Sequence, residues 1–329
     1  MHNILQIFLL ALLSTDTKPL FDRHNMHFQQ AHLWHLLSIA NLIMKKIFSL
    51  LLPLALCAPT MTSAQSLVPN SAFYLGIGGS LNSTSFNNQS IEATGLSDAY
   101  DKTTVAFLQS GSAVGPPVTL SMPSQTGVAP TLQAGYFKHF QESKWLWGAK
   151  FSYNGLDLSS KTDNFLIPQY GSYGSTPFTG NATVRTFKTN VSHQFALMPF
   201  IGHSFDNSFI YAGAGPTLTQ INTNIDNLIG FADIKGNRTD ISGTPQNLSS
   251  TQWVVGGAVT VGATYFLNSS WFIDLNYNFA MTPNQTANYS STFNNTNGNT
   301  NVNYSGSLIG SSSAKTTTQT ISISINKAF

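Results

Sequence analysis

The stretch that decides the fold runs from Lys315 to Phe329 and reads Lys-Thr-Thr-Thr-Gln-Thr-Ile-Ser-Ile-Ser-Ile-Asn-Lys-Ala-Phe. Side chains along a β-strand alternate between its two faces. From Ile321 onward, one face therefore carries isoleucines and the other carries small polar residues. The pattern predicts a strand with one apolar and one polar face. A strand at the edge of a water-soluble sheet and a strand that faces lipid both fit it.

The same alternation recurs in seven earlier segments, although one of them is rich in Gly and Ala and its facing is ambiguous. They are Phe73–Leu81, Val128–Phe140, Trp145–Asn154, Arg185–Gly202, Phe209–Gln220, Trp253–Tyr265 and Trp271–Phe279. With the last strand this makes eight, and an even number of such segments is typical of transmembrane β-barrels. At this number of strands, a barrel interior is just wide enough to be filled by its own side chains. The sequence therefore predicts an all-β fold, an eight-stranded antiparallel transmembrane β-barrel.

The alternation also assigns side chains to the two faces of the predicted barrel. The residues expected to face lipid are Trp147, Phe151, Val255, Val259, Ile273, Leu275, Ile323 and Ile325. In the fourth segment the apolar face includes Phe187 and Val191, so that Lys188 points inward. The polar lumen residues are then Lys150, Lys188 and Asp274. Because an unpaired charge is costly in a narrow interior, these three are expected to form an ion pair or to contact water.

The links between the segments alternate in length. The short ones are Gln141–Lys144, His203–Ser208 and Asn268–Ser270, and the long ones are 82–126, 159–184, 221–250 and 280–314. Short periplasmic turns at one end and long extracellular loops at the other are typical of outer-membrane barrels. Aromatic residues gather near both ends of the segments, which favours two interfacial girdles. The stretch 284–303 contains eight asparagines and is expected to be a mobile, solvated surface loop.

The beginning of the sequence predicts secretion. Residues 44–64 consist of two lysines, a short apolar run and small polar residues, which is the layout of a signal peptide cleaved between Ala64 and Gln65. Residues 1–43 stand before this signal peptide, where a signal peptide would normally begin the chain, and are interpreted as a misassigned upstream extension. Cys57, the only cysteine, lies inside the signal peptide. The remaining 65–329 are assigned to the barrel.

The composition of the barrel segment excludes some function classes. Only 9% of the whole chain is charged, and eleven basic and eleven acidic residues follow Ala64. No basic face remains for nucleic acid. No cofactor site, metal site or catalytic group is expected, since His139 and His203 fit solvated imidazoles near the short turns better than a metal pair.

Several short motifs carry a family resemblance. The opening Phe73–Ser80, the motif Tyr211–Pro216 and the terminal Phe329 resemble the small bacterial outer-membrane barrels of the opacity/OmpA-like type. The resemblance implies an outer membrane of a Gram-negative bacterium, with lipid and lipopolysaccharide around the barrel. It also implies that Phe329 is part of the signal read by the barrel-assembly machinery.

The family contains proteins of several functions, so the fold does not determine the role. One hypothesis is a non-catalytic surface protein, adhesive or structural, whose loops contact host or matrix ligands. The alternative is a small passive porin-like channel. Long loops on a rigid scaffold favour the first, while small inward residues such as Gly76, Gly256 and Ser322 leave the second open.

Overall fold

The computed structural model describes residues 66–296 and 301–329. Every described residue belongs to one compact unit, 65–329. Among the described residues, no helix has the length and apolarity that a membrane crossing needs. The extension 1–43, the signal peptide 44–64 and its cleavage site between Ala64 and Gln65 lie outside the described residues and stay predictions.

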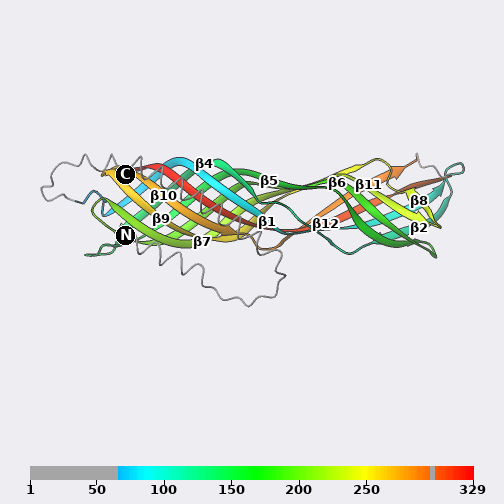
Figure 1. The fold of residues 1–329 in the computed structure, drawn as a ribbon, viewed down its shortest axis with the longest axis horizontal. Coiled ribbons are helices and arrows are strands. Elements are labelled where there is room, and N and C mark those ends of the chain that lie inside the picture. Colours follow the sequence, from blue (N-terminus) through cyan, green and yellow to red (C-terminus); the bar gives the residue numbers. More distant parts are fainter. Residues whose placement is uncertain (1–65, 297–300) are drawn as a thin grey trace. The chain divides into compact units, whose positions relative to one another are not determined.

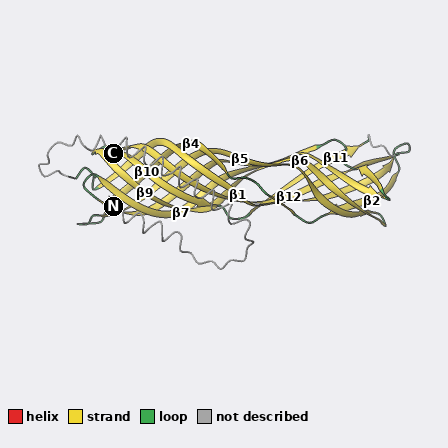
Figure 2. Ribbon diagram, in the orientation of Figure 1, coloured by secondary structure: helices red, strands yellow, loops and turns green. Residues whose placement is uncertain are grey.

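Nearly all of the described chain is β-strand (Figure 2). The strands are β1 (Ser71–Asp101), β2 (Phe107–Val114), β3 (Val118–Leu120), β4 (Gln125–His139), β5 (Trp145–Tyr173), β6 (Thr176–Ser204), β7 (Ser208–Ile234), β8 (Asn237–Asp240), β9 (Gln246–Asn268), β10 (Trp271–Met281), β11 (Gln285–Asn295) and β12 (Val302–Ala328). They form one 12-stranded antiparallel sheet.

Eight of these strands pair in a closed cycle. From β1 the pairing passes to β4, β5, β6, β7, β9, β10 and β12 in turn. The cycle closes because β12 pairs with β1, from Tyr74 opposite Ala328 to Asp101 opposite Val302. The first and last strands of the described chain are therefore neighbours, and the cycle leaves no open edge near the short turns.

The sheet has two parts that differ in their strand partners. We call the part with the short turns the proximal half, made of 71–86, 125–139, 145–156, 193–204, 208–220, 254–268, 271–281 and 316–328. We call the rest of the described sheet the distal half. Six strands, β1, β5, β6, β7, β9 and β12, run from one half into the other (Figure 1). In the distal half β2 and β3 pair with β1, β8 with β7 and β11 with β12.

The distal half corrects the prediction of four long loops. The links expected at 82–126, 159–184, 221–250 and 280–314 are largely strand, and β5 and β6 are joined by residues 174–175 alone. Twelve strands replace the eight expected, because β2, β3, β8 and β11 lie inside these links. The prediction failed because Ser, Thr and Asn dilute the apolar alternation there, and this alternation is the signal by which a strand is recognised in a sequence.

The Asn-rich stretch 284–303 is corrected in the same way. Residues 285–295 form β11, which pairs with β12 from Gln285 opposite Ala314 to Asn295 opposite Tyr304. Tyr289 and Phe293 are buried in the core of the distal half. Apolar side chains at every second or fourth position pack inward and order the strand, although most of its residues are polar.

Candidate functional site

The interior of the proximal half is polar at its centre, and it is built around one ion pair. Lys150 on β5 and Asp274 on β10 are both almost fully buried, with Nζ and Oδ2 3.4 Å apart. The sequence analysis expected Lys150, Lys188 and Asp274 to form an ion pair or to contact water, and two of these three residues are paired here. Strands β5 and β10 are not neighbours in the sheet, so the pair bridges the interior of the cycle.

Further donors surround the carboxylate of Asp274. Tyr211 donates its hydroxyl to Oδ1 at 2.9 Å, while Gln133 and Asn276 donate side-chain amides to Oδ2 at 3.1 Å and 3.0 Å. Lys150 in turn lies 2.6 Å from the Tyr211 hydroxyl. A buried charge is tolerable only when its lone pairs and protons are satisfied in this way. The network therefore links four strands of the cycle across the interior.

A cluster of aromatic rings fills the interior on the side of the short turns. It consists of Tyr74, Phe137, Phe200, Phe209, Tyr211, Phe266 and Phe272. The ring centroids of Phe266 and Phe272 are 4.8 Å apart, and those of Phe137 and Phe209 are 5.2 Å apart. We call this cluster the aromatic plug. The sequence analysis did not predict this cluster; the available signal was phenylalanine on the otherwise polar parity of the strands.

Polar side chains occupy the interior on the other side of the ion pair. Thr84 and Thr318 share a hydrogen bond of 3.0 Å, Thr320 donates to Asn82 at 2.8 Å, and Ser322 donates to Asn276 at 2.8 Å. All of them are buried. The plug, the ion pair and this layer together fill the proximal interior with side chains.

The outer face of the proximal half is apolar. Seven of the eight residues expected to face lipid have side chains that are 43–66% exposed on this face, namely Trp147, Phe151, Val255, Val259, Leu275, Ile323 and Ile325. The eighth, Ile273, is partly buried there. The cationic side chains Lys138 and Lys327 stand at the short-turn end of this face, and Lys327 lies over the Trp271 ring. The outer side chains between these lysines and Asp157 are uncharged.

Two rows of aromatic rings border this apolar face. Near the short turns, the ring of Tyr136 lies 4.6 Å from Phe73 and 5.9 Å from Trp147. Towards the distal half, Phe195 lies 5.1 Å from Tyr153 and 5.7 Å from Trp253. The two rows lie towards opposite ends of the apolar face, and rings with an apolar body and a polar tip favour the level of lipid headgroups in membrane proteins.

The distal half has the opposite polarity. Its interior is an apolar core that includes Ile91, Ile167, Phe187, Ile225 and Leu308, while its outer face carries Ser, Thr, Asn and charged residues such as Lys161 and Asp163, which pair at 2.8 Å. An apolar interior with a polar exterior is the arrangement of a protein surrounded by water. The sheet therefore reverses its inside-to-outside polarity along its own strands.

β-Bulges accompany this reversal. The register shifts between Asn87 and Ser90 on β1, between Gly155 and Leu158 on β5, between Val191 and His193 on β6, and between Ile225 and Leu228 on β7. An extra residue in one strand changes which sequence parity points inward beyond it. Asn88, Asp157 and Asn227 have positive φ at three of these shifts, and Asn and Asp tolerate this conformation better than most residues.

The bulge on β6 places Lys188 differently from the expectation. Phe187 and Val191 are buried in the distal core, and Lys188 lies partly exposed opposite Lys161 of β5. Reading one continuous alternation across the bulge put Lys188 in the lumen and Phe187 outside. The buried ion pair therefore consists of Lys150 and Asp274 without Lys188.

The remaining predicted positions lie near the short turns. The backbone N–H of Phe329 donates to the carbonyl of Phe73 at 2.8 Å, and its side chain is exposed. His139 contacts the carbonyl of Asn70, and the ring of His203 packs edge-on against Trp145. The structure does not bring the two histidines into a metal-binding group within its described residues.

At the other end of the molecule, a turn after β1 holds a carboxylate. Asp101 Oδ1 accepts the backbone N–H groups of Thr104 and Thr103 at 2.8 Å and 2.9 Å. These hydrogen bonds lower the pKa of the Asp101 carboxyl. Val105, in the same turn, has a φ of 58°. Its side chain is 70% exposed, so the turn presents an apolar side chain to its surroundings.

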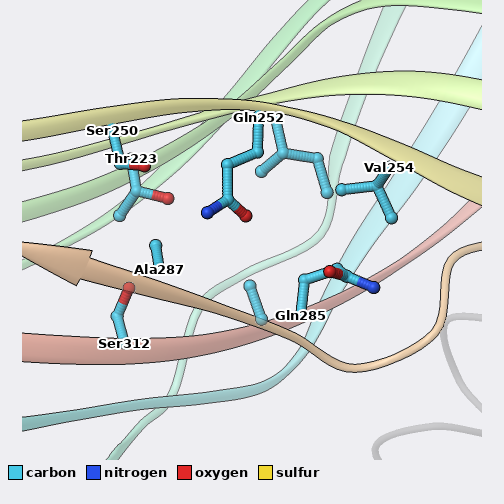
Figure 3. Close-up of a pocket in the computed structure, with 9 residues that line it drawn as sticks. Thr223, Ser250, Gln252, Val254, Gln285, Ala287 and Ser312 are labelled. Atoms are coloured by element: carbon cyan, nitrogen blue, oxygen red, sulfur yellow. The ribbon is translucent and has the colours of Figure 1, made fainter.

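Two small cavities lie in the distal half. One, of about 50 Å³, is mostly apolar and is bordered by Leu96, Tyr173, Phe178 and Phe293 among others. The other, of about 10 Å³, lies between β9 and β11 (Figure 3). Thr223, Ser250, Gln252, Gln285 and Ser312 supply its polar lining. Neither cavity brings together groups suited to catalysis.

Comparison with known proteins adds no family. No family model matches the chain, and no curated protein matches it. Solved structures of outer-membrane proteins resemble it only loosely. The outer membrane protein OprG from Pseudomonas aeruginosa has 13% identity and a TM-score of 0.34, over 80% of this chain and 99% of that chain.

Two other solved structures are similar at the same distant level. Ail, the attachment invasion locus protein of Yersinia pestis, has 11% identity and a TM-score of 0.24, over 72% of this chain and 98% of that chain. The outer membrane protease OmpT from Escherichia coli has 8% identity and a TM-score of 0.25, over 78% of this chain and 97% of that chain.

Proposed function

We propose that this chain is an outer-membrane β-barrel protein of a Gram-negative bacterium, with a non-catalytic role in surface interaction. The proximal half spans the bilayer as an eight-stranded barrel, and the distal half stands outside the cell. The observation that carries the proposal is the reversal of polarity along the strands. Lipid surrounds an apolar exterior, and water surrounds a polar one.

The physics of the bilayer supports the closed cycle of the proximal half. Hydrocarbon offers no partner for a backbone N–H or C=O group, so every strand edge inside it has to be paired. A tilted strand needs about 9–11 residues to cross, and β10, from Trp271 to Met281, has 11. The two aromatic rows and the charges beyond them then lie at the two interfaces.

The distal half offers the surface that such a role requires. Across β12, β1, β2 and β5, the aligned positions Ile309, Thr94, Val114 and Tyr170 form a row on the outer face. Ile309, Val114 and Tyr170 are exposed, as is Leu96 next to them. Apolar groups gathered on a surface that faces water mark interaction sites. We propose that this row contacts a host or matrix ligand.

Assembly follows from the same proposal. The barrel-assembly machinery reads the strand that ends at Phe329, whose side chain points outward where a partner reaches it. Lipopolysaccharide and other outer-membrane lipids surround the proximal half. Deletion of Phe329 is expected to impair insertion into the outer membrane while secretion continues. The heat-modifiability of the protein in the membrane fraction measures how much of it is folded and inserted.

The alternative function, a small passive channel, finds less support in the interior. The aromatic plug, the ion pair and the polar layer occupy the lumen of the proximal half in succession. Purified protein in a planar bilayer is expected to be electrically silent at moderate voltage. Steady unitary currents would favour the channel instead.

The interaction role is tested by binding to host-cell monolayers or immobilised matrix proteins. The variant Leu96→Ser/Val114→Ser/Tyr170→Ser changes exposed side chains only, so its fold is retained, and binding falls at least about tenfold. The control Lys161→Ser/Arg185→Ser/Arg238→Ser alters exposed side chains of the distal half outside this row and leaves binding unchanged. Equal binding by the first variant and the parent protein would contradict the proposed surface.

A further inference from the structure

The closed pairing of the sheet is interrupted between β9 and β11, from the border of the proximal half outward into the distal half. The last pair between β9 and β10 joins Gly257 to Met281. Beyond it, β9 pairs with β7 alone, and β11 pairs with β12 alone. We call the gap between β9 residues 246–256 and β11 residues 285–294 the seam.

Only side chains connect the two strands across the seam among the contacts of the described residues. Gln252 donates its amide to the backbone carbonyl of Thr286 at 3.4 Å, and Ser291 donates its hydroxyl to Gln246 at 2.7 Å. The small cavity lies here, with Gln252 and Ser250 on one side and Gln285 and Ala287 on the other (Figure 3). Two glutamine side chains thus stand where a backbone ladder would run.

Facing edges of this kind are unusual because proteins protect exposed edges. Charged side chains, proline and bulges are the common protection. Residues 246–256 and 285–294 contain neither a charged side chain nor a proline. Half of the main-chain groups of each strand point along the sheet towards the seam, as in any strand with a ladder on one side. The seam is therefore a template for another strand.

We propose that the seam accepts an extended, uncharged segment of another polypeptide as an added β-strand. Only an extended polypeptide carries N–H and C=O groups on both sides at the spacing of a ladder. A charged segment is disfavoured, because the lining offers no opposite charge to a side chain that loses water. Both edges are about eleven residues long, which sets the length of the segment that pairs.

The direction of the segment follows from the topology. β10 and β11 both run antiparallel to β12, and β9 runs antiparallel to β10, so β9 and β11 run in opposite directions. A single inserted strand then pairs antiparallel with one edge and parallel with the other. Cα atoms of β9 and β11 approach within 8 Å of each other, whereas a strand between them needs two ladder spacings of about 4.8 Å each. Entry therefore breaks the two side-chain hydrogen bonds across the seam, moves the two edges apart and replaces the side-chain contacts with a ladder.

The experiment uses a fluorescent synthetic peptide with the sequence of residues 285–295, which is uncharged and forms a strand in this protein. Binding to the folded protein in detergent is measured by fluorescence anisotropy. A peptide N-methylated at alternate residues has the same side chains but lacks donors along one edge. The inference predicts that the unmodified peptide binds and that N-methylation weakens binding at least about tenfold. Equal binding of both peptides, or of neither, would overturn it.

Variants that weaken the contacts across the seam are expected to raise peptide affinity, whereas N-methylation of the peptide lowers it. Gln246→Ala/Gln252→Ala removes the contacts that hold the seam together, so peptide affinity rises several-fold. The control Gln220→Ala removes a glutamine on β7 that bonds Ser192 instead and leaves affinity unchanged. Cross-linking Thr251→Cys to Thr286→Cys with a short bis-maleimide, in a Cys57→Ser background, abolishes binding. The same cross-link between Asn190→Cys and Asn222→Cys, which already pair, does not.

This inference rests on the proposed function, because a partner reaches the seam only if the distal half lies outside the cell. Labelling of Thr251→Cys on intact cells with a membrane-impermeant maleimide distinguishes failure of strand addition at the seam from failure of the proposed topology. A labelled cysteine without peptide binding contradicts strand addition alone. An unlabelled cysteine on folded, inserted protein contradicts the proposed position of the distal half outside the cell.

Discussion

At the scale of single residues, Lys150 and Asp274 show how the interior tolerates charge. The carboxylate of Asp274 faces an ammonium, a phenol and two amides, all from other positions of the cycle. Attraction between buried charges offsets the cost of removing them from water only when such donors are present. The pair therefore ties β5 to β10 and specifies how their side chains meet.

Removing one partner of this pair leaves the other charge uncompensated. Lys150→Met is expected to lower the free energy of unfolding by about 3–5 kcal/mol, measured by urea unfolding from lipid vesicles. The double variant Lys150→Met/Asp274→Asn removes both charges and recovers much of the loss. If the double variant is as unstable as the sum of the two single variants, the pair is not coupled as the geometry indicates.

Val259 and Thr251 test the reversal of polarity on one strand. Both are exposed on the outer face of β9, Val259 in the proximal half and Thr251 next to the seam. Val259→Lys places a charge in hydrocarbon and is expected to cost about 2–4 kcal/mol of unfolding free energy. Thr251→Lys stays in water and changes it by less than about 0.5 kcal/mol. Similar costs at both sites would argue against a membrane boundary between them.

At the scale of elements, the bulge on β6 determines which residues are inside. Ser192 is the extra residue, since Val191 pairs with Ile221 and His193 pairs with Gln220. Deleting Ser192 is expected to leave Val191 and Phe187 facing inward, because it removes the residue that has no partner on β7. Deleting Asn190 instead turns Phe187 and Val184 outward.

The two deletions therefore differ in cost. Each buried side chain that turns outward loses about 1.5–3 kcal/mol, so deletion of Asn190 lowers the free energy of unfolding by at least about 3 kcal/mol. Deletion of Ser192 costs clearly less. Chemical unfolding of the two variants, side by side in the same detergent, measures the difference. Equal losses would show that the bulge does not determine the facing of β6.

The bulges also mark the limit of what the sequence predicts. Alternation located the proximal strands and their outward residues, because apolar and polar side chains alternate strictly there. It expected an ion pair among Lys150, Lys188 and Asp274 but did not say which of the three residues form it. It failed at Lys188 and Phe187, because a bulge resets the parity without any break in composition. Asn88, Asp157 and Asn227, residues that tolerate positive φ in mid-strand, were the available signal for the other register shifts.

The distal strands were missed for a different reason. Water on the outside and an apolar core inside would produce a clear alternation, but Ser, Thr and Gly occupy many inward positions such as Ser312 and Thr223. In β11 the inward Ala287, Tyr289 and Phe293 do share one parity. The asparagines between them, a composition that resembles a flexible loop, concealed it.

At the scale of the whole described unit, one sheet carries two opposite polarities. Its proximal half has an apolar exterior around a polar interior, and its distal half has the opposite arrangement, although the same backbone ladders run through both. No change of secondary structure separates them. The account therefore predicts that the bilayer surface crosses the strands near the bulges at Asp157 and Ser192.

A spin-label scan of the outer face of β5 and β6 tests this claim most directly. Labels at Phe151 and Leu197 are placed in the proximal half, and labels at Lys161 and Arg185 in the distal half, with the protein in lipid vesicles. The account predicts that oxygen relaxes the first two labels and that a water-soluble nickel chelate relaxes the last two. Oxygen-dominated relaxation at Lys161 and Arg185, or chelate-dominated relaxation at Phe151 and Leu197, would contradict it.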